Sequence, residues 1–238
     1  MDSVDSALAA ERGGARRVEL CDNLVEGGTT PSAGMIEIVR SRLTIPIVVM
    51  IRPRGGDFLY DLDELGVMRH DALNAKAAGV AGIAIGFLHD DGTVDADRTR
   101  AFVELARPLP VTFHKAFDMT RDLGEALETL VSLGVHRVLT SGGARSVIDG
   151  VDELGELVRQ SAGRIVVMAG GGVRVENAAH IVESTGVTEL HGRAAVRRNS
   201  GMTFRNERVR MSMSTTPEEY ELMATDELRV REIVSSLK

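Results

Sequence analysis

Several residue types are scarce in this 238-residue chain, and each scarcity excludes a class of protein. The single cysteine, Cys21, excludes an internal disulfide framework and fits a reducing compartment. Aromatic residues make up 3% of the chain and tryptophan is absent, which argues against a stacking surface for single-stranded nucleic acid. The net charge of −7 argues against a general nucleic-acid binder, because phosphate contacts need a basic face.

Long apolar stretches are also lacking. No run reaches the roughly 18 residues that a membrane helix needs, and no signal peptide opens the chain. The sequence therefore predicts a cytoplasmic protein that has neither a membrane nor a nucleic acid as its partner.

Short runs rich in valine and isoleucine recur along the chain, each bounded by glycine or proline. They predict seven strands, at 17–21, 45–52, 82–88, 110–114, 137–141, 165–169 and 188–191. Helical patterns lie between them, and the repeat of roughly 30 residues is the size of one βα unit. This alternation predicts an α/β fold with a parallel sheet, either open or closed into a TIM-type (β/α)8 barrel. No linker interrupts it, so we expect residues 1–238 to form a single domain.

Capping residues predict where several helices begin and end. Asp61 and Asp122 each precede a helical pattern, and these two patterns stop at Gly79 and Gly134. The chain opens with a capped helix at 2–12 and no strand before it, so the predicted barrel lacks its first strand at the N-terminus. From 216 onward the pattern predicts a closing helix with a second cap at 225 or 226.

Side chains alternate between the two faces of a strand, so their parity shows which of them share a face. If the apolar parity packs under the helices, the barrel axis receives Glu19, Cys21, Arg52, His114, Glu189 and His191. One interpretation is a buried ion-pair network that fills the barrel. The other is a site, because converging buried charges at strand carboxyl ends are typical of one. On the second interpretation, the candidate catalytic residues are His114, Asp118, Glu19, Glu189 and His191.

The most informative segment is Ile51-Arg52-Pro53-Arg54-Gly55-Gly56-Asp57-Phe58, directly after a buried strand. Its arginines present planar donor groups suited to phosphate or carboxylate. The glycine run at 170–172 ends a later strand and opens a helix, where such barrels hold phosphate, although a simple tight turn explains it equally well. The predicted anion-binding residues are Arg52, Arg54, Ser141, Gly171, Gly172 and Arg193.

These residues favour an enzyme that acts on a small anionic, possibly phosphorylated, metabolite. His114 would be its general acid or base, oriented by Asp118 or Glu189, and Arg52 with Arg54 would clamp the anion. The residues support a metal site less well than an anion site, because copper(I) binds through about two to four soft thiolate or thioether ligands. Cys21 is the main metal-ligand candidate, with His114 or His191 near it and the pair Met211-x-Met213 as further ligands. A lone buried cysteine is usually a small hydrophobic residue, and such a methionine pair usually reflects packing or chance.

Six segments of the chain resemble the CutC copper homeostasis family. They are residues 14–21, 26–32, 51–58, 111–118, 138–142 and 168–173. The resemblance runs from Asp2 to the closing helix and implies a cytoplasmic TIM-type barrel that binds copper and takes part in copper homeostasis, as a homo-oligomer. The functional prediction is therefore this family role, with the enzyme as the alternative.

The chain departs from the family pattern at its start. Family members usually begin with an apolar strand before the segment that matches Asp2, whereas here Met1 stands at that strand's last apolar position. Our hypothesis is that translation begins upstream of Met1 or that the chain is truncated. The intact mass of the native protein checks it.

Overall fold

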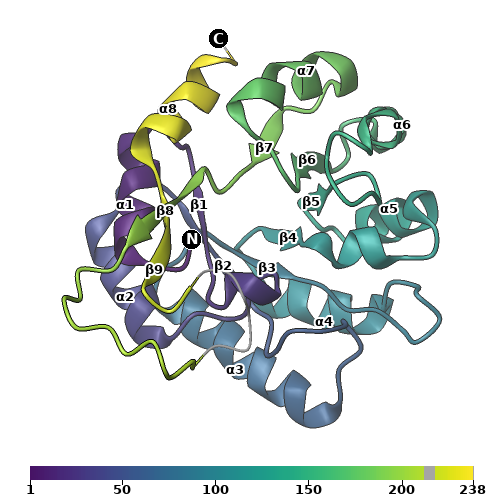
Figure 1. Ribbon diagram of the computed structural model, residues 1–238. Coiled ribbons are helices and arrows are strands. Elements are labelled where there is room, and N and C mark those ends of the chain that lie inside the picture. Colours follow the sequence, from purple (N-terminus) through teal and green to yellow (C-terminus); the bar gives the residue numbers. More distant parts are fainter. Residues whose placement is uncertain (212–217, 238) are drawn as a thin grey trace.

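A computed structural model describes residues 1–211 and 218–237 of the chain. Strands and helices alternate along it (Figure 1). In chain order the elements are α1 (Val4–Arg12), β1 (Val18–Leu20), η1 (Leu24–Glu26), α2 (Ala33–Arg42), β2 (Ile47–Met50), α3 (Leu62–Ala77), β3 (Gly82–Ile85), α4 (Ala96–Ala106), β4 (Val111–Phe113), η2 (Lys115–Met119), α5 (Leu123–Ser132), β5 (Arg137–Thr140), α6 (Val151–Ser161), β6 (Val166–Gly170), α7 (Val175–Thr185), β7 (Glu189–His191), β8 (Ala195–Asn199), β9 (Glu221–Thr225) and α8 (Glu227–Ser235).

The seven predicted strands form one parallel sheet in the order β1-β2-β3-β4-β5-β6-β7, which confirms the predicted fold class. The sheet curves into most of a ring, and the helices surround its outer face (Figure 1). Ile47, Val49 and Ile51 belong to the core between sheet and helices. Val48 and Met50 have the opposite parity and line the interior of the barrel, as the alternation predicts.

The ring is open between β1 and β7, which are not paired with each other in the described part of the chain. Met1 lies beside β1 at this opening. Its amino group donates to the Glu19 carbonyl at 2.5 Å, and its carbonyl accepts from the Cys21 N–H at 2.9 Å. These two bonds have the pattern of a parallel ladder, so Met1 pairs with Leu20 in the way a residue of an eighth strand would.

The predicted caps at Asp61 and Asp122 are confirmed. The Asp61 side chain accepts a hydrogen bond from the N–H of Glu64, and the Glu64 side chain accepts one from the N–H of Asp61. The Asp122 side chain accepts from the N–H of Glu125. Gly134 follows α5 with a φ of +73°, a backbone conformation that glycine adopts without strain. The capping residues and the glycine therefore start and end these helices as the sequence predicts.

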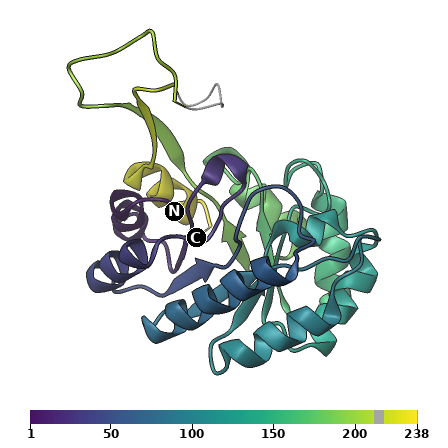
Figure 2. The same ribbon diagram turned by 90° about the horizontal axis from the view of Figure 1, so that it is seen from below.

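The predicted closing helix is partly wrong. Positions 216 and 217, where it would begin, lie outside the described residues. From Glu221 to Thr225 the chain is strand β9, which pairs antiparallel with β8, and only the second cap begins a helix, with Asp226 capping α8. The hairpin of β8 and β9 extends away from the barrel (Figure 2). No helix among the described residues is long and apolar enough to cross a membrane.

The last elements of the chain pack against the first helix. Arg12 of α1 pairs with Glu227 of α8 at 2.7 Å, and the Thr225 N–H donates to the Ser6 hydroxyl at 3.1 Å. Gly13 permits this contact, because a Cβ there would lie 2.5 Å from the Val230 Cβ. The helices α1 and α8 consequently lie side by side at the edge of the open ring (Figure 1).

Candidate functional site

The interior of the barrel holds a cavity of about 1710 Å³ that reaches the opening between β1 and β7. The inward-facing side chains of the strands and the loops at their carboxyl ends line its inner part, and residues of α7, α8 and the segment after α1 line the part at the opening. Among the predicted site residues it collects Glu19, Cys21, Arg52, His114, Gly171, Gly172, Glu189, His191 and Arg193. The six side chains that parity assigned to the barrel axis therefore all line this cavity, and their roles stay predictions.

His114 follows β4 and is 3% exposed. Its Nδ1 accepts a hydrogen bond from the Ala116 N–H at 3.1 Å, which caps the short helix η2. Its Nε2 is buried without a hydrogen-bond partner among the described residues. The Phe58 ring lies 5.2 Å from the imidazole. Burial, reinforced by the charge of Arg52, lowers the pKa of His114 to about 3, so the ring is neutral at physiological pH.

Lys115, Asp118 and Ser141 form a polar network beside His114. The Lys115 ammonium lies 2.8 Å from the Asp118 carboxylate and donates to the Ser141 hydroxyl at 2.7 Å. Asp118 also accepts from the N–H groups of Ser141 and Gly143 and from the Thr140 hydroxyl. The Asp118 carboxylate therefore accepts hydrogen bonds at both oxygens, and it holds the Lys115 ammonium at the cavity wall.

The loop after β6 brings two glycines to the same wall. Gly171 and Gly172 have φ values of +101° and +92°, which favour glycine. The Gly171 carbonyl accepts a hydrogen bond from the Val147 N–H, and the Gly172 carbonyl accepts one from the Asn177 side-chain amide. A Cβ on Gly171 would lie 3.1 Å from the Lys115 Nζ, so a larger residue would press on this cation in addition to straining the backbone.

The two arginines of the predicted anion clamp are engaged by the protein itself. Arg52 is 4% exposed and donates to the carbonyls of Glu26, Gly28 and Gly56. Arg54 pairs with Glu64 at 2.5 Å and donates to the carbonyl of Leu59. The sequence analysis predicted both guanidinium groups as an anion clamp and did not foresee that they bond the loop backbone; the clamp role stays a prediction.

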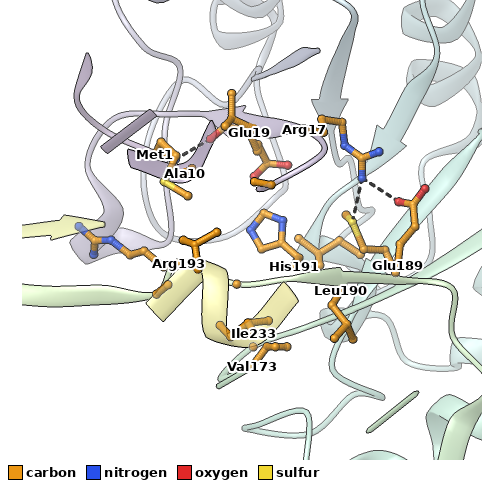
Figure 3. A pocket seen from close by; sticks show the side chains of 18 of the residues that line it. Met1, Ala10, Arg17, Glu19, Val173, Glu189, Leu190, His191, Arg193 and Ile233 are labelled. Carbon is orange, nitrogen blue, oxygen red and sulfur yellow. Dashed lines mark hydrogen bonds and ion pairs between the residues drawn. The ribbon is translucent and has the colours of Figure 1, made fainter. Parts of the chain in front are cut away.

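Glu189 lies across the opening from β1, within an ion network (Figure 3). Arg17 contacts its carboxylate at 2.7 Å and Arg137 contacts it at 2.5 Å. Burial alone would raise the pKa of Glu189, but the hydrogen bonds from the two arginines outweigh it and lower the pKa to about 2. This arrangement has the form of the buried ion-pair network that the sequence left open as an alternative.

His191, Glu19 and Arg193 lie nearer the opening. The His191 ring points toward Glu19 (Figure 3), and burial lowers its pKa although the Glu19 charge opposes the effect. Arg193 contacts Asp2 at 3.1 Å, so its charge is partly neutralised within the chain. His191, at the end of β7, is also close to Lys115. A Cβ on Gly170 would lie 3.1 Å from the His191 Cβ, and one on the adjacent Gly171 would lie 3.1 Å from the Lys115 Nζ.

Sulfur atoms line another part of the cavity. Cys21 and Met50 are both buried and both lie against Gly28, where a Cβ would be 3.4 Å from the Cys21 Cβ and 2.9 Å from the Met50 sulfur. Met168 also lines the cavity. No group of three or more His, Cys, Asp or Glu side chains suited to a metal occurs in residues 1–211 and 218–237. A metal here would need thioether ligands.

Three lining residues escaped the sequence analysis as site residues, namely Lys115, Met50 and Met168. Strand parity could have found the two methionines, since Met50 has the parity of Arg52. Lys115 directly follows His114 in the chain, and η2 turns it to the cavity, which no strand pattern predicts.

Comparisons with known proteins give concordant results. The model of the CutC family matches residues 1–196. A copper homeostasis protein cutC homolog from Mus musculus is 51% identical over 97% of this chain and 85% of its own length, and the homolog from Homo sapiens is 50% identical over the same shares.

Solved structures resemble the fold in the same way. The crystal structure of a CutC from Streptococcus agalactiae matches with a TM-score of 0.78 and 35% identity, over 81% of this chain and 95% of that one. An aldolase, QR15, matches with a TM-score of 0.58 and 15% identity, over 79% of this chain and 81% of that one, a likeness of fold alone.

Proposed function

The chain belongs to the CutC family, and from this premise we propose that it takes part in copper homeostasis by holding copper(I) in the barrel cavity. The observation that supports this proposal is the placement of Cys21 and Met50 together against Gly28. Copper(I) favours thiolate and thioether ligands and accepts a small number of them. Copper is here the cargo of the protein.

The protonation state of Cys21 makes the proposal testable. Burial raises the pKa of the Cys21 thiol, although the nearby terminal amine opposes the shift. Because the thiolate is the ligand, copper must displace a proton, and its affinity should rise about tenfold per pH unit while the thiol remains protonated. A site built on imidazole would lose this dependence above neutral pH.

Competition with a chromophoric copper(I) chelator measures the affinity. We expect one equivalent of copper(I) on the native protein, loss of binding in Cys21→Ala and weaker binding in Met50→Leu. Met68→Leu is the matched control, because Met68 is a fully buried methionine of α3 between sheet and helices. Unchanged stoichiometry in Cys21→Ala would refute the copper site.

A second candidate function, an enzyme acting on a small anionic metabolite, has its own supporting observation. The buried Nε2 of His114 has no partner and belongs to the same cavity as Lys115 and Gly171. A polar group without a partner is costly unless a ligand or water satisfies it. In this proposal, Lys115 attracts the anion and His114 meets the reacting part of the substrate.

Thermal shift with inorganic phosphate and short carboxylates tests the anion site. We expect the melting temperature of the native protein to rise with at least one anion, and the shift to disappear in Lys115→Met. Arg121→Met is the control, since Arg121 follows the same strand but pairs with Asp91 at the surface. No shift with any anion would count against this function.

A cytoplasmic location and a homo-oligomeric assembly remain parts of our proposal, open to fractionation and sedimentation measurements.

A further inference from the structure

The backbone fixes which nitrogen of His114 carries the proton. The Ala116 N–H donates to Nδ1, so Nδ1 must present its lone pair and cannot also hold a hydrogen. In a neutral imidazole the hydrogen then lies on Nε2. His114 is therefore a donor at Nε2, and the nitrogen that could accept a proton is already occupied.

The surroundings hold the ring in this orientation. On the β3 side, a Cβ on Gly86 would lie 2.3 Å from the imidazole Cε1, so the ring packs directly on that glycine. Phe58 covers another side, with Arg52 stacked on the Phe58 ring at 4.9 Å. The Nε2 donor is left buried and unsatisfied in a ring that lines the cavity.

An acceptor without a proton of its own would satisfy this donor. The charge nearest along the chain is that of Lys115, which reaches the cavity wall beside Gly171. Because both residues line the same cavity, a ligand that meets both groups carries an acceptor oxygen and an anionic group. A carbonyl next to a carboxylate or phosphate has this chemistry.

We propose that His114 is a fixed, uncharged hydrogen-bond donor that binds the carbonyl oxygen of a small oxo acid or oxo phosphate whose anionic group pairs with Lys115. This inference rests on the enzyme candidate above and changes the role of His114 within it. His114 donates a hydrogen bond to the carbonyl oxygen and polarises the carbonyl, without itself giving up or accepting a proton.

Pyruvate and propionate are the probes, because they share a carboxylate and differ in the carbonyl oxygen. Calorimetric titration of the native protein should show at least tenfold tighter binding of pyruvate. In His114→Phe, which keeps an aromatic ring at this position, the ratio of the two affinities should fall to about one. The control is His136→Phe, since His136 precedes β5 at the opposite end of the barrel.

Nitrogen-15 NMR of the native protein tests the tautomer without any substitution. We expect His114 to show a protonated Nε2 and a bare Nδ1, unchanged between pH 5 and pH 8. A ring that titrates in this range, or that carries its proton on Nδ1, would overturn the inference.

The binding results separate the two levels of the proposal. If neither probe binds, the anion site fails, and the role of His114 fails with it. If both bind with equal affinity in the native protein, the anion site stands and the carbonyl contact is refuted.

Discussion

The ion network around Glu189 should contribute measurably to stability, and its contribution should depend on pH. The carboxylate is half-buried between Arg17 and Arg137, and both contacts join elements that are far apart in the sequence. Replacing Glu189 by Gln removes the negative charge and leaves two guanidinium groups facing each other. Breaking a partly buried pair in this way is among the strongly destabilising changes.

The size of the effect follows from the pKa. The shift of the Glu189 pKa from 4.5 to about 2 corresponds to about 3 kcal/mol of unfolding free energy at pH 7. Because the pKa is lower in the folded protein, this stability is present above the unfolded pKa and disappears as the pH falls through the folded pKa. About 0.8 kcal/mol of it is lost at pH 4 and about 2 kcal/mol at pH 3.

Urea unfolding of the native protein and of Glu189→Gln at pH 7, 4 and 3 measures this difference. We expect Glu189→Gln to lose about 3 kcal/mol at pH 7 and progressively less in acid. Glu128→Gln is the control, because Glu128 forms a two-bonded pair with Arg164 at the surface and should cost little. A loss below about 1 kcal/mol at pH 7, or one that does not shrink on acidification, would refute the reasoning.

Three further outcomes are expected. Gly171→Ala should abolish the thermal shift with anions and destabilise the protein, because its Cβ would crowd the Lys115 ammonium and its φ is +101°; an unchanged anion shift would show that the ligand lies elsewhere. Arg52→Lys should speed proteolytic cleavage in the 53–61 loop, since lysine cannot reach the three carbonyls that Arg52 bonds; unchanged cleavage would mean that the loop holds itself. Asp118→Asn should weaken anion binding through a displaced Lys115 while far-UV circular dichroism stays unchanged; full anion affinity would show that Lys115 needs no partner.

Most of the fold was predictable because its signals are local. Each strand is a short apolar run between breakers, and most helices begin at a side-chain cap, as at Asp61 and Asp122, although α6 and α7 do not. The failure at Glu221–Thr225 has a tertiary cause. Its residues suit a helix, but the segment finds a partner in β8 and a hydrogen bond from Thr225 to Ser6, and these non-local contacts override local preference.

The sequence predicted which side chains line the cavity better than it predicted which hydrogen bonds they form. Parity alone placed Glu19, His114 and His191 around one cavity. It could not show that Arg52 is bonded to three backbone carbonyls, because those come from loops whose positions are not written in the local sequence. Nor could parity show which ring nitrogen of His114 accepts a hydrogen bond from a backbone N–H, since that depends on the turn that follows the strand.

The packing of α1 against β9 and α8 has a consequence for how the protein is made. The six βα units from β1–α2 to β6–α7 can assemble as they leave the ribosome, but Ser6, Arg12 and Gly13 find these partners only in the final stretch of the chain. Helix α1 thus leaves the ribosome well before β9 and α8 and reaches its final packing only when they have been made. Nascent chains stalled before residue 220 should expose α1 to proteases and chaperones, whereas released chains should protect it.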